Sequence, residues 1–292
     1  MKYRNTDNWK NEMKKAAKLN GADVPSMQQR FILEEFAKKI GSSAYGDRLI
    51  LKGGFIVSTL LGMDTRTTRD LDVTCRTTIY DISGMENIVK EVLETPTDSF
   101  FEYELADIKP AQKDDENTGF IVSINARKDN ISLNLKIDVS NNTLIYPDAI
   151  RTTLPSMFDE KDIDLLSYPL ENIIAEKYET TLDRGEFNSR MRDLYDIYFL
   201  MRDSRHLIDE NLLADTIIKV SEERETLDNL YEFEEILEEL QESSAFQTAF
   251  NKHGEKFGFE YITLNDVFET FREIQDLVEI ELNIDECVSV KV

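Results

Sequence analysis

The sequence predicts an α+β protein. A mixed sheet flanked by helices is expected in an N-terminal domain over residues 1–165, and a helical bundle over residues 166–292. Alternating apolar and polar residues, typical of strands, fall before residue 140, whereas apolar residues at helical spacing dominate from residue 170 onward. Three prolines lie between these two patterns, and we interpret their stretch as an interdomain crossing: Pro147, Pro155 and Pro169.

Composition indicates a globular chain without a disulfide framework or a zinc site. Its 292 residues are 41% hydrophobic and include two cysteines, Cys75 and Cys287, which lie far apart. Two histidines, His206 and His253, leave little room for histidine-based catalysis. The N-terminus is charged and lacks an apolar leader, and no apolar stretch reaches the length of a membrane span. We therefore expect a cytoplasmic protein with no membrane partner.

The net charge of −24 argues against a general nucleic-acid binder, because nonspecific affinity comes from neutralising phosphates. The acids are unevenly distributed, since 23 Asp and Glu face only 7 Lys and Arg from Arg205 onward. Bases gather earlier in the chain, at Lys10, Lys14, Lys15, Lys18, Arg66, Arg69 and Arg76. A nucleic acid is therefore expected to dock on the N-terminal two-thirds.

The N-terminal domain is expected to begin with two helices and a short strand. Residues 8–19 have apolar residues on one side and lysines elsewhere, which indicates either a packing helix or an RNA-contacting arm. A proline opens a second helix over residues 25–41, and residues 48–51 form the first strand. A capping box at 83–86 begins a helix to about residue 93. Further strands are expected over residues 100–108, 120–127 and 131–139.

The helical domain follows the prolines. Its helices are expected over residues 170–184, 189–202, 209–223, 227–240 and 264–282. Glutamates at helical spacing over residues 232–239 are typical of a solvated face.

Nucleotide chemistry is expected where the first strand ends in Gly53 and Gly54. Glycine allows a sharp turn and close approach to a ligand, and a helix beginning there presents unpaired N–H groups to a phosphate. Asp70 and Asp72 follow two residues apart on a predicted strand, so both carboxylates project to the same side. Two acids held together favour a cation between them, which indicates Mg²⁺. Neither feature alone is specific, but their combination points to a nucleotide site.

Three later positions carry further candidates. Asp138 lies on the polar side of its strand, either as the third carboxylate of a metal site or as a solvent-facing acid. Lys177, among apolar helical residues, is either a phosphate ligand or a surface lysine whose ammonium extends to solvent. Asp193 and Asp196 lie three residues apart on one helix face beside arginines, either as an ion-pair network or with one of them serving as a base.

Together these segments resemble the AbiEii/AbiGii-type toxin family, nucleotidyltransferases of abortive-infection and type IV toxin–antitoxin systems within the DNA polymerase beta-like superfamily. Residues 51–72 resemble its first motif, and residues 136–139, with Asp138, its second. Residues 174–177 resemble the third motif and residues 190–196 the fourth. The resemblance covers at least half of the chain. Gly54 departs from the pattern, since many relatives have serine there, and Arg69 stands where relatives often have a small polar residue.

The resemblance implies a polymerase beta-like nucleotidyltransferase domain followed by a helical domain, with the active site in the cleft between them. Mg²⁺ would be held by Asp70, Asp72 and Asp138. The catalytic set would add Lys177 and Asp193, the latter as acid or base. A nucleoside triphosphate, with GTP or CTP as candidates, would be bound by Lys52, Gly53, Gly54, Arg69 and Lys177.

The implied reaction is attack of a hydroxyl of an RNA acceptor, the 3′ end of tRNA, on the α-phosphorus of the triphosphate. Translation and growth would stop as a phage defence. The cognate antitoxin of such systems is typically a winged-helix DNA-binding protein that need not touch the toxin. Two alternatives stay open: transfer to a protein or small-molecule hydroxyl, and a non-catalytic nucleotide-binding module that binds proteins through the acidic C-terminal third.

Overall fold

The computed structural model describes residues 3–63, 65–77, 79, 81–111, 119–141 and 144–289, with side chains up to residue 282. Two compact units make up the chain. The first comprises Met1–Thr143 and Ala149–Tyr168, and the second comprises Leu144–Asp148 and Pro169–Val292. The predicted domain boundary at residue 165 stays a prediction, because compactness alone does not establish that either unit folds independently.

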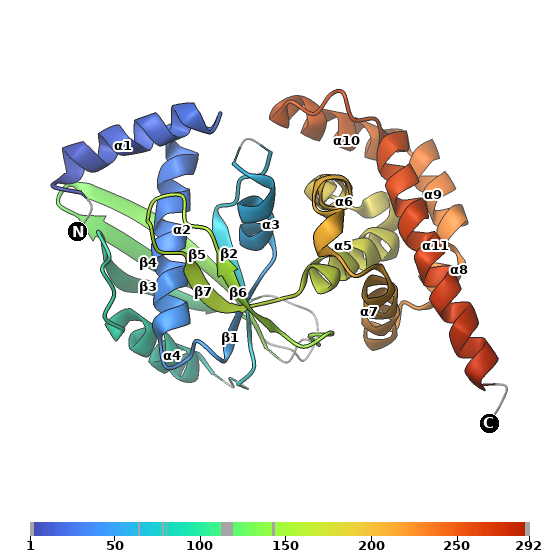
Figure 1. Ribbon diagram of the computed structural model, residues 1–292, viewed down its shortest axis with the longest axis horizontal. Coiled ribbons are helices and arrows are strands. Elements are labelled where there is room, and N and C mark those ends of the chain that lie inside the picture. Colours follow the sequence, from blue (N-terminus) through green and yellow to red (C-terminus); the bar gives the residue numbers. More distant parts are fainter. Residues whose placement is uncertain are drawn as a thin grey trace. The chain divides into compact units, whose positions relative to one another are not determined.

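Seven strands of the first unit form one mixed sheet in the order β3-β4-β5-β2-β1-β7-β6 (Figure 1). The strands are β1 (Leu49–Lys52), β2 (Asp70–Cys75), β3 (Glu102–Pro110), β4 (Phe120–Lys128), β5 (Ile131–Asn141), β6 (Ile150–Leu154) and β7 (Ile163–Ser167). The pairs β2–β5 and β1–β7 are parallel, whereas the other neighbours are antiparallel. This mixed sheet with its helices confirms the predicted α+β class.

Four helices belong to the first unit: α1 (Thr6–Leu19), α2 (Val24–Ser42), α3 (Gly54–Leu61) and α4 (Ile82–Glu94). Helices α2 and α4 cover one face of the sheet, where Phe36 and Met85 line a small apolar cavity together with Val73 and Val139. Since side chains alternate along a strand, the residues that come directly before and after Val73 and Val139 in the sequence project from the opposite face. That second face carries the polar residues of β2 and β5.

The stretch that we interpreted as an interdomain crossing contains β6 and β7 of the first unit, so most of that interpretation is wrong. Within this stretch the chain passes between the units only at Asp148–Ala149 and at Tyr168–Pro169. Its prolines lie outside the strands, where a missing N–H disturbs no ladder. Strand β7 pairs with β1 through Leu51 and Ser167, and the N–H of Tyr168 donates to the carbonyl of Leu51 at 2.9 Å. These strands extend the sheet beyond β1.

The capping box expected at 83–86 is also wrong. Asp81 is the N-cap of α4, and its carboxylate accepts from the N–H of Gly84 at 2.7 Å. Aspartate is as good a cap as serine, and it stands two residues earlier.

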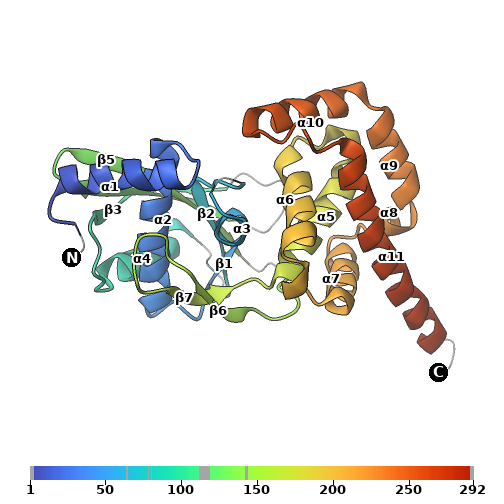
Figure 2. The same cartoon turned by 45° about the horizontal axis from the view of Figure 1, so that its top comes forward.

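The second unit is helical: α5 (Leu170–Arg184), α6 (Met191–Asp203), α7 (Glu210–Glu223), α8 (Asp228–Tyr231), α9 (Phe233–Glu242), α10 (Ser244–Phe257) and α11 (Leu264–Ser289). Helix α5 packs against α6 and α7, and α11 packs against α6, α7 and α9 (Figure 2). The helix expected over residues 227–240 is two helices, α8 and α9. Helix α10 was not predicted, because the buried side chains of α10 form only a narrow stripe. Throughout the described ranges, no helix is both long enough and apolar enough to cross a membrane.

Candidate active site

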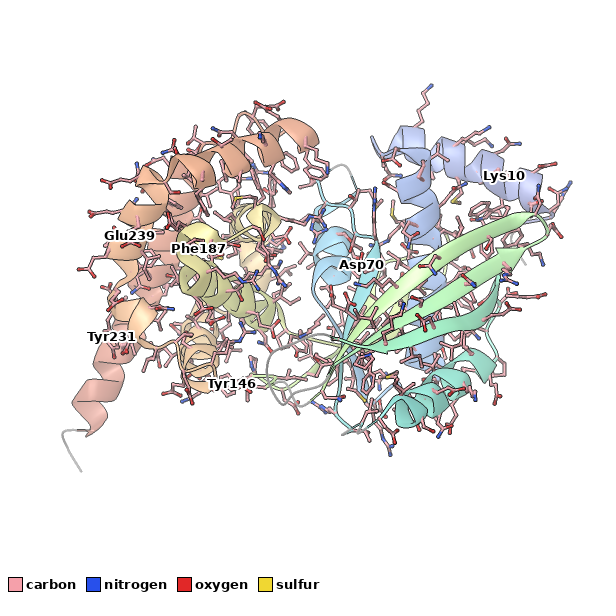
Figure 3. The ribbon with its side chains drawn as sticks, turned by 180° about the vertical axis from the view of Figure 1, so that it is seen from behind. Lys10, Asp70, Tyr146, Phe187, Tyr231 and Glu239 are labelled. Atoms are coloured by element: carbon pink, nitrogen blue, oxygen red, sulfur yellow. The ribbon has the colours of Figure 1, made fainter. Side chains whose placement is uncertain are left out.

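Three aspartates lie on the polar face of the central strands. The parallel register of β2 and β5 pairs Asp72 with Asp138 and Asp70 with Lys136. Paired residues of neighbouring strands project to the same side, so the three predicted carboxylates share one face. Figure 3 labels Asp70 at the beginning of β2. The sheet therefore brings together acids that lie far apart in the sequence.

Like charges around Asp72 oppose its ionisation. Burial raises the pKa of the Asp72 carboxyl, and the charges of Asp138 and Asp70 raise it further. The Lys52 ammonium and the N–H of Gly54 act in the opposite direction. The balance favours a site that becomes more stable once a cation joins the three acids.

One carboxylate oxygen of Asp138 has no hydrogen-bond partner among the described residues. Its Oδ2 accepts from Lys136 Nζ at 2.8 Å, and that hydrogen bond raises the pKa of the lysine. Its Oδ1 is buried and has no hydrogen-bond donor among the described residues. Carboxylate oxygens are the ligands that Mg²⁺ prefers, so this unsatisfied oxygen fits the predicted metal.

The aspartates do not form a closed metal cage. In the part of the chain that the structure describes, no group of three or more acid, histidine or cysteine side chains is arranged to hold a metal ion. Mg²⁺ usually keeps several waters and takes further oxygens from substrate phosphates, so an open set of carboxylates is consistent with such a site.

The two glycines form a tight turn directly beside Asp72. Gly53 has φ 68°, a conformation that favours glycine, and a Cβ there would lie 2.5 Å from Asp72 Oδ2. The N–H of Gly54, the first residue of α3, donates to the same oxygen at 3.4 Å. The beginning of α3 and the acidic face therefore meet, as the nucleotide-site prediction requires.

Lys52 and Arg69 differ in their surroundings. Lys52 is the register partner of Asp72, and its Nζ lies 5.2 Å from the centre of the Tyr168 ring. The side chain of Arg69 is exposed, while its carbonyl accepts from Gln29 Nε2 at 2.7 Å. Lys52 thus belongs to the polar face, whereas the proposed role of Arg69 stays a prediction.

Lys177, Asp193 and Asp196 form a cluster within the second unit. The Lys177 ammonium on α5 forms ion pairs with Asp193 and, at 2.9 Å, with Asp196 Oδ2, both on α6. The side chain of Asp196 is 2% exposed and that of Asp193 is 14% exposed. Lys177 is therefore not a lysine that extends freely to solvent. Asp193 and Asp196 form ion pairs with this lysine of a neighbouring helix, whereas the sequence had indicated the arginines beside them.

A family model described as nucleotidyl transferase AbiEii toxin, type IV TA system, matches residues 36–274. The chain belongs to this family. The resemblance inferred from the motifs is confirmed, and the AbiEii-family protein is a nucleotidyl transferase toxin. No curated protein sequence matches it significantly.

Two solved structures from Helicobacter pylori resemble the AbiEii-family protein. JHP933 has a TM-score of 0.50 and 14% identity, over 91% of this chain and 99% of that chain. A candidate nucleotidyltransferase has a TM-score of 0.48 and 16% identity, over 88% and 97%. At such identity, the likeness to JHP933 shows a shared fold and nothing more.

Two side chains of the AbiEii-family protein were missed as site residues. Arg66 and Thr68 are buried against the backbone of Gly54. The sequence holds a signal for them, since Arg66, Thr68, Asp70 and Asp72 are spaced two residues apart, as side chains on one side of an extended segment are. We considered Arg66 only as one of several bases.

Proposed function

We propose that this AbiEii-family protein transfers a nucleoside monophosphate from a nucleoside triphosphate to a hydroxyl of RNA, at the 3′ end of tRNA. Pyrophosphate is released, and the modified RNA stops translation as a phage defence in the cytoplasm. The observation that carries the proposal is the pairing of Asp72 with Asp138 beside the Gly53–Gly54 turn. An acidic face next to a helix beginning suits a metal and a phosphate together.

Asp70, Asp72 and Asp138 would hold Mg²⁺ in this proposal. When bound, the ion supplies positive charge to the attacking and leaving oxygens. The beginning of α3 binds phosphate through its backbone N–H groups, and neither Gly53 nor Gly54 has a side chain of its own that would keep the phosphate away. Lys52 lowers the negative charge of the face, since it is paired in register with Asp72.

Lys177 and Asp193 are assigned the remaining roles. Asp193 and Asp196 hold the Lys177 ammonium, which keeps its orientation fixed for a phosphate. Asp193 is the more exposed acid and accepts the proton of the attacking hydroxyl. The hydroxyl oxygen forms a bond to the α-phosphorus while the bond to the oxygen bridging the α- and β-phosphates breaks, and pyrophosphate leaves.

The acceptor is tested by following the label from each α-labelled nucleoside triphosphate in turn. Purified protein is incubated with Mg²⁺, total RNA and a cell protein extract, and the products are digested separately with ribonuclease and protease. Label in tRNA with one preferred nucleotide is expected. Label that resists ribonuclease but not protease favours a protein acceptor, which the acidic surface with its net charge of −24 would suit. Triphosphate binding without transfer favours the non-catalytic module.

The antitoxin need not cover the site in this proposal. A winged-helix antitoxin encoded alongside would act without direct contact, so the toxin should purify alone and remain active in the presence of the antitoxin. Inhibition of transfer by a stoichiometric amount of antitoxin would contradict this part of the proposal.

A further inference from the structure

The backbone of Gly54 is in contact with two polar side chains of the segment that leads into β2. A Cβ on Gly54 would lie 2.7 Å from Arg66 Nη2 and 3.0 Å from Thr68 Oγ1. Arg66 is 8% exposed and Thr68 is 7% exposed, so both are packed into this position. The space that a side chain at position 54 would need is therefore already filled by a guanidinium and a hydroxyl.

The two side chains are oriented by their own segment. Arg66 Nη1 donates to the carbonyl of Thr67, and Thr68 Oγ1 donates to the carbonyl of Asp70 at 3.3 Å. The backbone N–H of Arg66 donates to the carbonyl of Gly62 at 2.9 Å, which fixes the segment to the end of α3. The guanidinium is thus held in place before any ligand arrives.

An anion at the beginning of α3 would contact Arg66 as well. The beginning of α3 carries the positive end of the helix dipole, and the Arg66 guanidinium lies beside it. An anion bound there interacts favourably with both. Arginine matches phosphate oxygens with several N–H donors, and a threonine hydroxyl adds one more.

We propose that Arg66 and Thr68 bind the β- and γ-phosphates of the nucleoside triphosphate and thereby replace the hydroxyl that many relatives carry at position 54. This inference rests on the proposed function, since it assigns further residues to the same nucleotide. It also explains why position 54 is glycine. A serine there would displace the Arg66 guanidinium, which donates to the phosphates in place of the serine hydroxyl. A serine at position 54 and an arginine at position 66 are therefore alternative hydrogen-bond donors to the same phosphates.

The test is a pair of substitutions that should compensate each other. Binding of α,β-methylene analogues of the four nucleoside triphosphates, which cannot undergo transfer, is measured by calorimetry in Mg²⁺, together with binding of the monophosphates. Arg66→Ala should weaken analogue binding roughly tenfold to a hundredfold, as loss of a charge-assisted contact does, and leave monophosphate binding unchanged. Gly54→Ser alone should also weaken it. Gly54→Ser added to Arg66→Ala should restore part of the loss, because the serine then has room.

Matched variants separate binding from folding. Arg76→Ala removes the same charge from an exposed residue just beyond the other end of β2 and should bind like the wild type. Arg66→Lys keeps the charge and should bind better than Arg66→Ala. Should Arg66→Ala fail to fold in a thermal unfolding experiment, Arg66→Lys and Gly54→Ser carry the test, and both should weaken analogue binding selectively.

The outcomes distinguish this inference from the function on which it rests. Wild-type affinity in Arg66→Ala, equal losses for analogue and monophosphate, or purely additive effects of the two substitutions would overturn the role of Arg66 and leave the nucleotidyltransferase proposal standing. A wild-type protein that binds none of the analogues would overturn both.

Discussion

Asp72 of β2 and Asp138 of β5 are register partners in two parallel strands at the centre of the sheet. The pairing brings the carboxylates to one face, while Val73 and Val139, the next residues along each strand, pack on the opposite face under α2 and α4. The same alternation therefore builds the core and the acidic face. A shift of one residue in this register would destroy both at once.

The first prediction concerns the metal. Asp138→Asn should weaken Mn²⁺ binding, measured by calorimetry, by at least about tenfold, because a charged ligand with an unsatisfied oxygen is lost. Lys136→Met should instead tighten Mn²⁺ binding, because it removes the ammonium that occupies Asp138 Oδ2. Chelation of the metal should abolish transfer in the wild type. Unchanged Mn²⁺ binding in Asp138→Asn would remove this residue from the metal site.

The second prediction separates Asp193 from Asp196, which the sequence left undecided. Asp193→Asn should keep the stability of the wild type and lose transfer, because the more exposed acid is assigned the proton. Asp196→Asn should lower the free energy of unfolding by about 1–3 kcal/mol, since Asp196 is almost fully buried in its ion pair with Lys177. Urea unfolding and transfer assays on both variants check this. Equal effects on stability would contradict the distinction.

The third prediction concerns the buried pair that fixes α3. Arg30 Nε donates to Glu34 Oε1 at 2.7 Å, and both side chains are at most 2% exposed. The same guanidinium donates to Ser58 and Thr59 of α3 at 2.8 and 2.6 Å. Arg30→Met should lower the free energy of unfolding by about 3–5 kcal/mol, because it leaves Glu34 buried without its partner.

An exposed pair serves as the control for Arg30. Lys15 and Glu12 on α1 are 2.8 Å apart, with side chains 73% and 41% exposed. Lys15→Met should change the free energy of unfolding by less than about 1 kcal/mol. The free energies of unfolding of Lys15→Met and Arg30→Met are measured by urea unfolding. Similar losses in both variants would show that burial does not decide how much these ion pairs contribute to stability.

The fourth prediction is a pH dependence of stability through Glu35. Its carboxylate accepts from the N–H of Phe100 at 2.5 Å and from the hydroxyl of Tyr103 at 2.9 Å. Burial raises the pKa of Glu35 above its ordinary value of 4.5, and the hydrogen bonds only partly offset this. The folded protein then holds the proton more tightly than the unfolded chain. The contribution of Glu35 to stability is therefore greatest below pH 4.5 and declines as the pH rises through the raised pKa.

Glu35→Gln removes this titration while it keeps an acceptor oxygen. The free energy of unfolding of the wild type minus that of the variant should decrease as the pH rises through this window. Urea unfolding at several pH values measures the difference. A difference that is constant or increases with pH would contradict the assignment.

Local patterns in the sequence were sufficient for much of the fold. The alternation around Asp72 and Asp138 placed both acids on polar sides of strands, and helical spacing placed Lys177, Asp193 and Asp196 on helices. The pairing of β2 with β5 was beyond the sequence, because strand register depends on packing between distant segments. Strands β6 and β7 were missed because the sequence does not show whether a proline lies inside a strand or just beyond its end.

The positions of the other candidate site residues depend on contacts that leave no periodic pattern in the sequence. Arg66 reaches Gly54 only because the segment between α3 and β2 turns back to the beginning of the helix. The exposed Arg69 has the same charge three residues later, and composition cannot distinguish the two. Likewise, the different burial of Asp193 and Asp196 follows from the packing of α5 on α6.

The central claim is nucleotidyl transfer by the acidic face, and one measurement tests it most directly. Wild-type protein and Asp72→Asn are incubated with Mg²⁺ and RNA, once with the α-labelled and once with the γ-labelled preferred triphosphate. We expect the α-label to enter RNA and the γ-label to appear in pyrophosphate with the wild type, and neither to occur with the folded Asp72→Asn protein. Transfer of the γ-label to RNA, or full transfer by Asp72→Asn, would contradict the account.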